Sequence, residues 1–252
     1  MASSSSARLL LASLLFSSLC FCFCLASSQA SVPKVSLQLY YETLCPYCSR
    51  FMVNHLSKIF EDGLISIVDL DLIPYGNARV NSNDSITCQH GPNECLLNTI
   101  EACAISVWPD VSEHFKFIYC VELLVVDHKY ESWETCFEET GIDSTAVLKC
   151  YESGEGNKLE LQYAAKTDAL QPPHTYVPWV VVDGQPLYED YENFESYICK
   201  AYTGDLPKAC EVLPLTIHPK WIASADQVSY ADEVIISPVI HNKHGMKMKI
   251  LM

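Results

Sequence analysis

The sequence predicts an α/β fold in which a βαβ unit and a later ββα unit are separated by a helical insertion. Residues 35–42, VSLQLYYE, are rich in β-forming side chains and predict a strand. Two cysteines three residues apart, Cys45 and Cys48, follow this strand directly. Residues 175–190, TYVPWVVVDGQPLYED, have the pattern of a strand, an Asp-Gly turn and a second strand.

The first unit is completed by a helix and a buried strand. Residues 49–60 place Met52, Leu56, Ile59 and Phe60 on one helical face, and Gly63 fits the end of that helix. Residues 64–74, LISIVDLDLIP, then predict a buried strand that ends at a proline. The cysteine pair therefore falls at the N-terminus of the helix in a βαβ unit.

The middle of the chain, residues 93–165, is mostly helical by pattern, with breaks at 108–110, at Gly141 and at 153–156. Residues 191–202 close the chain's ordered part with helical spacing of Tyr191, Phe194, Tyr197 and Ile198. A βαβ start and a ββα finish predict a thioredoxin-like fold, with a disulfide-stapled helical insertion at about 75–170.

The first 30 residues have one charged residue, Arg8, followed by an apolar run and small residues at Ala26 and Ala30. We interpret them as a secretory signal removed near either alanine, in preference to a signal anchor or transmembrane helix, because serines interrupt the run. The domain is then expected at 31–210. The segment 211–252 contains no cysteine and loses the ordered pattern, so we expect a tail that is disordered or removed.

The composition limits the classes of partner and the cellular compartment that we expect. The chain has 16 Lys and Arg against 31 Asp and Glu, a net charge of −15, which argues against nucleic acid and anionic membranes as partners. Cys20, Cys22 and Cys24 lie in the signal, so 10 of the 13 cysteines remain. An even number of cysteines in an exported chain suggests disulfides. Asn83, in Asn-Asp-Ser, is the predicted glycosylation site.

Three kinds of site use two cysteines three residues apart: a redox dithiol, half of a zinc site and a structural disulfide. Zinc needs two further ligands, and no second pair with this spacing exists. At the start of a helix, Cys45 would be stabilised as a thiolate by the helix dipole and free N–H groups, and Cys48 would lie one turn away. We therefore predict Cys45 as the attacking thiol and Cys48 as the resolving thiol, with no cofactor.

Val177 and Pro178 form the second predicted part of the site. Thioredoxin-like proteins place a cis proline at the start of this strand, where its backbone faces the dithiol and the bound peptide. An ordinary trans proline at the first residue of a strand is the alternative. The fold context favours the cis form, and we predict that these two residues contact the substrate.

Residues 88–103, CQHGPNECLLNTIEAC, resemble position for position the CQHGxxECxxNxxExC signature of the gamma-interferon-inducible lysosomal thiol reductase family. With the cysteine pair and the Val-Pro loop, the resemblance covers about residues 35–210. The fixed positions of the signature are Cys88, Gln89, His90, Gly91, Glu94, Cys95, Asn98, Glu101 and Cys103.

The resemblance implies a soluble, glycosylated thiol oxidoreductase that reduces protein disulfides, in animal members within acidic endosomes and lysosomes. The thiol donor that recycles the pair stays open from the sequence, as does the choice between lysosome or vacuole and the extracellular space. The resemblance does not assign individual roles to the signature residues. We expect structural disulfides at Cys88, Cys95 and Cys103 rather than a second redox centre. His90 could move a proton or serve packing, and Asn98 and Glu101 are expected to have a capping or surface role.

Two other functions remain open from the sequence. A protein with the same fold could catalyse the opposite reaction, as an oxidase or isomerase that installs disulfides. The reduction potential of the dithiol would distinguish the two directions. A non-catalytic, disulfide-stapled binding module is the third possibility. The eight cysteines outside the Cys45–Cys48 pair allow 105 pairings, and the sequence selects none of them.

Overall fold

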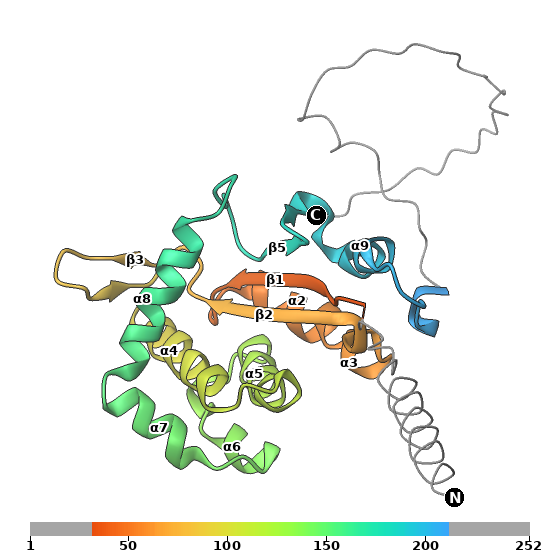
Figure 1. The fold of residues 1–252 in the computed structure, drawn as a ribbon. Helices are drawn as coiled ribbons and strands as arrows, with labels where there is room; N and C mark the ends of the chain where they lie inside the picture. Colours follow the sequence, from red (N-terminus) through yellow and green to blue (C-terminus); the bar gives the residue numbers. More distant parts are fainter. Residues whose placement is uncertain (1–31, 212–252) are drawn as a thin grey trace, which may run out of the picture. The chain divides into compact units, whose positions relative to one another are not determined.

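A four-stranded sheet forms the centre of the protein. The computed structural model describes residues 32–211. Strand β1 (Val35–Tyr41) pairs in parallel with β2 (Val68–Pro74) and antiparallel with β5 (Trp179–Val182), which also pairs with β6 (Gln185–Pro186). The order is therefore β2-β1-β5-β6, with β1 between neighbours on both sides (Figure 1). This topology confirms the predicted thioredoxin-like arrangement.

The alternation of side chains along β1 divides the interior into two cores. Leu37, Leu39 and Tyr41 are at most 1% exposed and point into the larger core, which the helices α2, α4, α5 and α9 share. Tyr40 points to the opposite face and packs in a smaller cluster with Trp179. Because successive residues of a strand face opposite sides, one strand organises both cores.

The helical stretch after the cysteine pair has three parts: α2 (Pro46–Phe51), a π-helical turn (Met52–Leu56) and α3 (Lys58–Glu61). Its predicted apolar face is correct, because Met52, Leu56 and Ile59 are fully buried. Gly63 ends it with φ of +81°, a conformation that favours glycine.

The strand predicted at 64–74 is too long by four residues. Leu64–Ile67 form a 3₁₀ turn, and β2 begins only at Val68. The side chains of Leu64 and Ile67 are buried in this turn, so their apolar character resembles that of strand residues.

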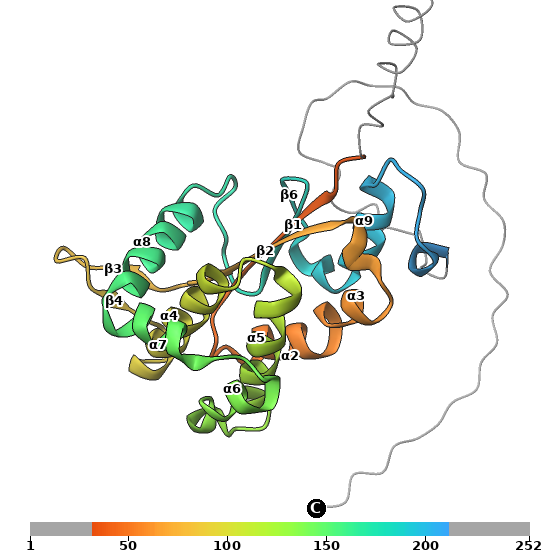
Figure 2. The ribbon, with the colours of Figure 1, turned by 60° about the horizontal axis from the view of Figure 1, so that its bottom comes forward.

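The insertion between β2 and β5 is helical as predicted, but it begins with a two-stranded hairpin that was not predicted. Its helices gather on one side of the molecule, and the central sheet separates α7 and α8 from α9 (Figures 1 and 2). Its elements are β3 (Arg79–Val80), β4 (Ile86–Thr87), α4 (Pro92–Val107), α5 (Val111–Val126), a 3₁₀ turn (Tyr130–Ser132), α6 (Thr135–Thr140), α7 (Ser144–Glu152) and α8 (Glu155–Asp168).

Four disulfides select one pairing from the possible 105. They are Cys88–Cys95, Cys103–Cys150, Cys120–Cys136 and Cys199–Cys210. The first three lie within the insertion, where they join α4 to the preceding loop, α4 to α7, and α5 to α6. Cys45 and Cys48 are the two described cysteines that carry free thiols.

The C-terminal part of the domain follows the predicted pattern with one shift. Asp183 and Gly184 form the β5–β6 turn, with φ of +46° and +77°. The helix predicted at 191–202 begins later, because Tyr188–Asn193 form a 3₁₀ helix and α9 spans Phe194–Ala201. A last 3₁₀ turn, Lys208–Glu211, places Cys210 against α9.

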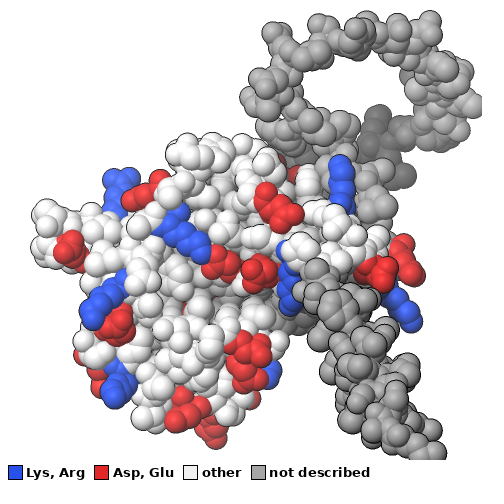
Figure 3. Space-filling model, in the orientation of Figure 1, with Lys and Arg blue, Asp and Glu red and all other residues white. Residues whose placement is uncertain are grey.

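The predicted secretory signal at 1–30 lies outside the described residues, as does the tail beyond Glu211. Within the described residues, no helix has the length and apolar character needed to cross a membrane. On the face drawn in Figure 3, acidic and basic side chains are scattered among uncharged ones, and most basic groups have an acidic neighbour. On this face the basic side chains do not form a continuous stripe.

Candidate active site

The two thiols sit at the beginning of α2, where the chain leaves β1. Cys45 is the N-cap residue, with extended backbone, and Pro46 occupies the first helical position. The amide of Cys45 donates to the Glu42 carbonyl at 3.2 Å, and the Cys45 carbonyl accepts from the Ser49 amide at 3.1 Å. Cys45 is 5% exposed and Cys48 is fully buried. Only the first thiol can therefore meet a substrate.

Val177 and Pro178 face this thiol from the other half of the chain. The Val177–Pro178 peptide is cis, as predicted. The Cys45 thiol lies 3.9 Å from the Val177 carbonyl oxygen, within the range of a weak sulfur hydrogen bond. The structure thus brings together residues that are 132 positions apart.

The surroundings of the two thiols shift their pKa values in opposite directions. The pKa of Cys45 is lowered to about 6, first by a hydrogen bond with the Cys48 thiol and then by the Cys48 and Tyr47 amides and the charge of His90, against the opposing effect of burial. Burial raises the pKa of Cys48 well above its ordinary value, and the neighbouring Cys45 adds to this. One sulfur is therefore prepared as an anion while the other keeps its proton.

This separation decides what the pair can do in acid. With a pKa of about 6, Cys45 is roughly one-tenth ionised at about pH 5, whereas an ordinary cysteine with a pKa near 8.5 is ionised in roughly one part in 3,000. The thiolate is the nucleophile in thiol–disulfide exchange. The site can therefore attack disulfides at a pH where free cysteine is almost inactive.

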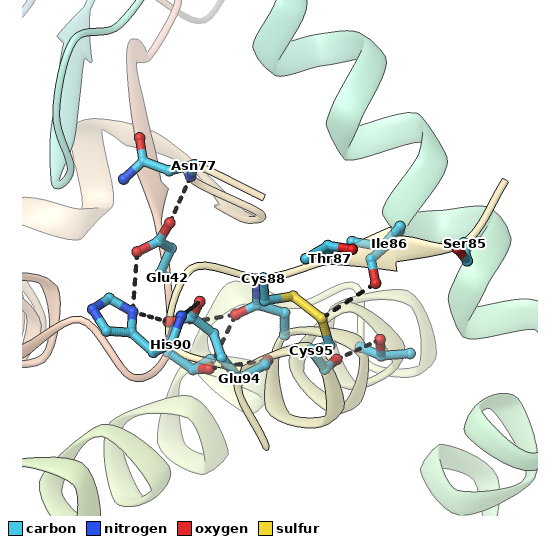
Figure 4. Close-up of a disulfide and its surroundings, with 12 residues drawn as sticks. Glu42, Asn77, Ser85, Ile86, Thr87, Cys88, His90, Glu94 and Cys95 are labelled. Atoms are coloured by element: carbon cyan, nitrogen blue, oxygen red, sulfur yellow. Dashed lines mark hydrogen bonds and ion pairs between the residues drawn. A yellow bond between two sulfur atoms is a disulfide. The ribbon is translucent and has the colours of Figure 1, made fainter. Parts of the chain in front are cut away.

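The first half of the signature forms the loop that leads into α4 (Figure 4). Cys88 and Cys95 close this loop with a disulfide. The Gln89 side chain accepts a hydrogen bond from the Asn77 amide group at 2.7 Å. Gly91 starts the helix with φ of +92°, which favours glycine there.

The second half of the signature lies inside the protein, which corrects our expectation for Asn98 and Glu101. Both are fully buried and do not have a surface role. Asn98 Oδ1 accepts from the Thr43 amide at 3.1 Å and the Thr43 hydroxyl at 3.0 Å. Glu101 accepts from the Tyr41 hydroxyl at 2.6 Å. Helix α4 thereby fixes the end of β1, from which the cysteine loop begins.

An Asn98→Ala variant should be less stable than the parent by about 2–3 kcal/mol, because it leaves the buried Thr43 amide without its acceptor. Urea unfolding measures this difference. Asn93→Ala on the exposed part of the same helix is the matched control and should change stability by less than about 0.5 kcal/mol. Equal stability of the two variants would contradict the anchoring role of Asn98.

The sequence reasoning missed the burial of several carboxyl groups, of which Glu42 and Glu122 interact with Cys45. Glu42 is buried, and burial together with the charge of Glu94 raises its pKa to about 7. Burial raises the pKa of Glu101 to about 8 and raises the pKa of Glu122 and Glu160 well above the usual range. Both carboxyl oxygens of Glu122, on α5, have no hydrogen-bond partner in the structure. These groups keep their protons in acid.

Glu42, His90 and Glu94 form the one trio of potential metal ligands among residues 32–211, with ligand atoms within 4.8 Å of one another. The distance between His90 Nδ1 and Glu94 Oε2 is 2.5 Å, which is that of a short, charge-assisted hydrogen bond. We therefore interpret the trio as a hydrogen-bonded ion-pair group. The dithiol chemistry itself needs no metal ion.

Comparisons with known proteins agree with this geometry. The family model described as "Gamma interferon inducible lysosomal thiol reductase (GILT)" matches residues 36–140. A "Gamma-interferon-responsive lysosomal thiol protein" of Arabidopsis thaliana is 43% identical over 208 residues, which cover 79% of this chain and 85% of the relative. A "Gamma-interferon-inducible lysosomal thiol reductase" of Carassius auratus is 38% identical over 185 residues, or 70% and 72% of the two chains.

Among solved structures, the oxidised Mtb DsbA superposes with a TM-score of 0.50 at 18% identity, over 75% of this chain and 94% of that chain. The reduced form of the disulfide bond oxidoreductase DsbG from Mycobacterium tuberculosis also gives a TM-score of 0.50 at 18% identity, over 74% and 88%. At this level of identity the likeness shows the shared fold.

Proposed function

Since this chain belongs to the gamma interferon inducible lysosomal thiol reductase family and is a thiol-disulfide oxidoreductase, we propose that Cys45 and Cys48 reduce the disulfide bonds of protein substrates. The observation that carries the proposal is the pairing of a low-pKa thiol with a buried thiol of raised pKa in one helical turn. An attacking thiol needs a low pKa, so that it is ionised, and a resolving thiol must stay protonated until the mixed disulfide has formed.

The reaction begins with the Cys45 thiolate. It attacks one sulfur of the substrate disulfide, forms a mixed disulfide and displaces the other substrate sulfur as a thiolate, which takes up a proton. The substrate peptide lies against Val177 and Pro178, whose backbone carbonyl already faces the Cys45 sulfur. Tyr47, 61% exposed with the Arg50 guanidinium 5.0 Å from its ring centre, offers an aromatic surface beside the same opening.

The second step belongs to Cys48. Its thiol loses a proton and attacks the Cys45 sulfur, which breaks the mixed disulfide and releases the second substrate thiol. The substrate has then gained two electrons and two protons, and the protein holds a Cys45–Cys48 disulfide. An external thiol donor returns this disulfide to the dithiol. Burial and the neighbouring Cys45 both raise the pKa of Cys48, and the charge of Cys45 no longer contributes once its sulfur is part of the mixed disulfide.

We place this activity in the domain at residues 31–210, in an acidic compartment of the endolysosomal route. The apolar segment at 1–30 supports entry into the secretory pathway. Asn83 supports it also, because this glycosylation sequon is exposed on the turn between β3 and β4. The names of the relatives place those proteins in lysosomes. The lowered pKa of Cys45 would keep the dithiol active there.

A Cys48→Ser variant tests the proposal, because it stops the reaction after the first step. We expect it to accumulate mixed disulfides with insulin through Cys45 at about pH 5, visible by mass spectrometry and reversed by dithiothreitol. The matched control, Cys45→Ser with Cys48→Ser, should capture nothing. Capture by the double variant would show that another cysteine reacts. Failure of Cys48→Ser to capture insulin would contradict the dithiol mechanism.

The direction of electron flow is read from the parent protein in the same assay. A reductase supplied with a thiol donor cleaves insulin disulfides with turnover. A protein that installs disulfides would instead oxidise a reduced client faster than it cleaves insulin, and that result would replace the proposal with the oxidase alternative.

A further inference from the structure

His90 lies between two buried carboxyl groups. Its Nδ1 is 2.5 Å from Glu94 Oε2 and 3.4 Å from Glu42 Oε2 (Figure 4). The side chains of Glu94 and Glu42 are 0% and 1% exposed, while that of His90 is 34% exposed. Within residues 32–211, neither carboxyl group forms an ion pair with a lysine or an arginine. The imidazole is therefore the group that can balance charge there.

The backbone fixes this arrangement from both sides. Glu94 Oε1 accepts from the His90 amide at 3.0 Å, so the carboxyl group holds both the backbone and the ring of His90. Glu42 Oε1 accepts from the Asn77 amide at 2.6 Å, which turns Oε2 toward the ring. The Cys88–Cys95 disulfide closes the loop that carries His90. The ring therefore has little freedom to leave Glu94, its hydrogen-bond partner, or the neighbouring Glu42 carboxyl group.

This ion-pair group borders the attacking thiol. The Glu42 carbonyl accepts the hydrogen bond from the Cys45 amide at 3.2 Å, so the carboxyl group and the thiol belong to one turn of the chain. The charge of His90 lowers the pKa of Cys45, and the Cys45 thiolate in turn raises the pKa of His90. Burial alone would lower the pKa of His90, but its hydrogen bond with Glu94 and the surrounding negative charges outweigh this effect.

The other titratable groups that interact with Cys45 cannot supply positive charge. They are Glu42 in the loop before α2, Cys48 in α2, Glu122 on α5 and Tyr191 in the 3₁₀ helix before α9. All four are neutral or negative. His90 is thus the cationic group among the named contributors to the pKa of Cys45.

We propose that His90 is a positioning residue of the disulfide-reduction site, held as an imidazolium chiefly by Glu94, with Glu42 against the same ring, so that its charge stabilises the Cys45 thiolate. The inference rests on the proposed function and gives the His and Glu of the signature a specific role. It also explains the two buried carboxyl groups beside this histidine: Glu94 keeps the ring charged and in place, and Glu42 adds negative charge beside the ring as the pH rises through about 7.

The test is the rate of Cys45 alkylation by iodoacetamide between about pH 4 and 9, with reduced protein. In His90→Gln we expect the rate at about pH 5 to fall three- to tenfold, because the loss of a nearby positive charge raises the pKa of a thiol. His90→Lys restores a positive charge and should recover at least half of the lost rate. His55→Gln removes another half-buried histidine that faces a glutamate, and should match the parent. Thermal unfolding checks that each variant is folded.

A second measurement needs no substitution. Because coupling between two sites is reciprocal, the His90 imidazole should titrate at lower pH in the oxidised protein, where Cys45 carries no thiolate, than in the reduced protein. Nuclear magnetic resonance of the histidine rings reads this shift, and a purely structural His90 would not show it. Identical His90 titration in the two redox states overturns the inference, as does parental alkylation in His90→Gln. A parent protein whose Cys45 titrates like free cysteine would instead overturn the proposed function.

Discussion

A Cys45→Ser variant is expected to reduce insulin at no more than the background rate, a loss of about three orders of magnitude or more. A serine hydroxyl does not ionise near neutral pH and does not attack a disulfide, so neither step of the exchange can begin. The lowered pKa of Cys45 supports the proposal that this sulfur attacks as an anion. The insulin reduction assay at about pH 5 with excess thiol donor measures the effect.

The loss must come from chemistry and not from unfolding. Serine is close to cysteine in size, and Cys45 is not part of any of the four disulfides. Circular dichroism and thermal unfolding of the variant should therefore resemble those of the parent. Ser49→Ala, one turn further along the helix, removes a hydroxyl that bonds to the Cys45 carbonyl at 3.3 Å, and should keep most of the activity. Undiminished insulin reduction by a folded Cys45→Ser protein would contradict the assignment of the nucleophile.

The second large effect concerns stability: the free energy of unfolding should fall by on the order of 3 kcal/mol or more between about pH 5 and pH 8. The cause is the set of buried carboxyl groups. The pKa of Glu42 is raised to about 7 and that of Glu101 to about 8, both chiefly by burial, and the pKa of Glu122 and Glu160 is raised as well. Many proteins are most stable between about pH 5 and 8, so a decline across this range would be distinctive.

The sign follows from the proton count. In the unfolded chain a glutamate has a pKa near 4.3, so it is ionised above about pH 5. In the folded protein the same group keeps its proton until the pH passes its raised pKa. Unfolding therefore releases protons in this range, and a rise in pH favours it. The stabilisation is fully present below the unfolded pKa and is lost as the pH rises through about 7 for Glu42 and about 8 for Glu101.

Urea unfolding at a series of pH values measures the decline. Glu122→Gln keeps the size of the side chain but cannot ionise, so its stability should depend less on pH than that of the parent. Glu113→Gln is the matched control, because it removes an exposed carboxyl group from the same helix. It should leave the slope nearly unchanged. A stability that is constant or rises from pH 5 to 8 would show that these groups do not keep their protons in the folded state.

The fold was largely predictable because its signals are local. The residues of β1 and β2 have the apolar patterns of strands, and Gly63, Gly141 and the Asp183-Gly184 turn occur where the chain changes direction. The errors lie at the ends of elements. Leu64–Ile67 are as apolar as a strand but form a 3₁₀ turn, since both ends of the turn are buried by contacts that the local sequence does not specify.

The site was predictable only in part. The positions of Cys45, Cys48 and Pro178 follow from the fold, but the roles of the other signature residues depend on contacts between distant segments. Glu94, Asn98 and Glu101 are spaced by four and three residues, so they share one helical face. This polar stripe was the available signal that all three side chains face the interior of the protein.

The burial of this polar stripe could not be read from α4 alone, because the groups that donate hydrogen bonds to it lie at the end of β1 and just after it. Tyr41 and Thr43 supply the hydroxyl and amide partners, and they lie more than 50 residues earlier in the chain. The same holds for the Cys103–Cys150 disulfide, whose cysteines are 47 residues apart. Packing of α4 against other helices on several sides turns a face that would otherwise be solvated into part of the interior.

The most direct test of the account is the ionisation of the Cys45 sulfur in the reduced parent protein. Thiolate absorbance near 240 nm, followed from about pH 4 to 10 with Cys48→Ser as a reference for the contribution of the second thiol, measures it. The structure predicts that the first transition of the parent has its midpoint at about 6 and that Cys48 titrates only at much higher pH. A single transition near the ordinary cysteine value of about 8.5 would contradict the account, because the sulfur would then be protonated where the enzyme is proposed to act.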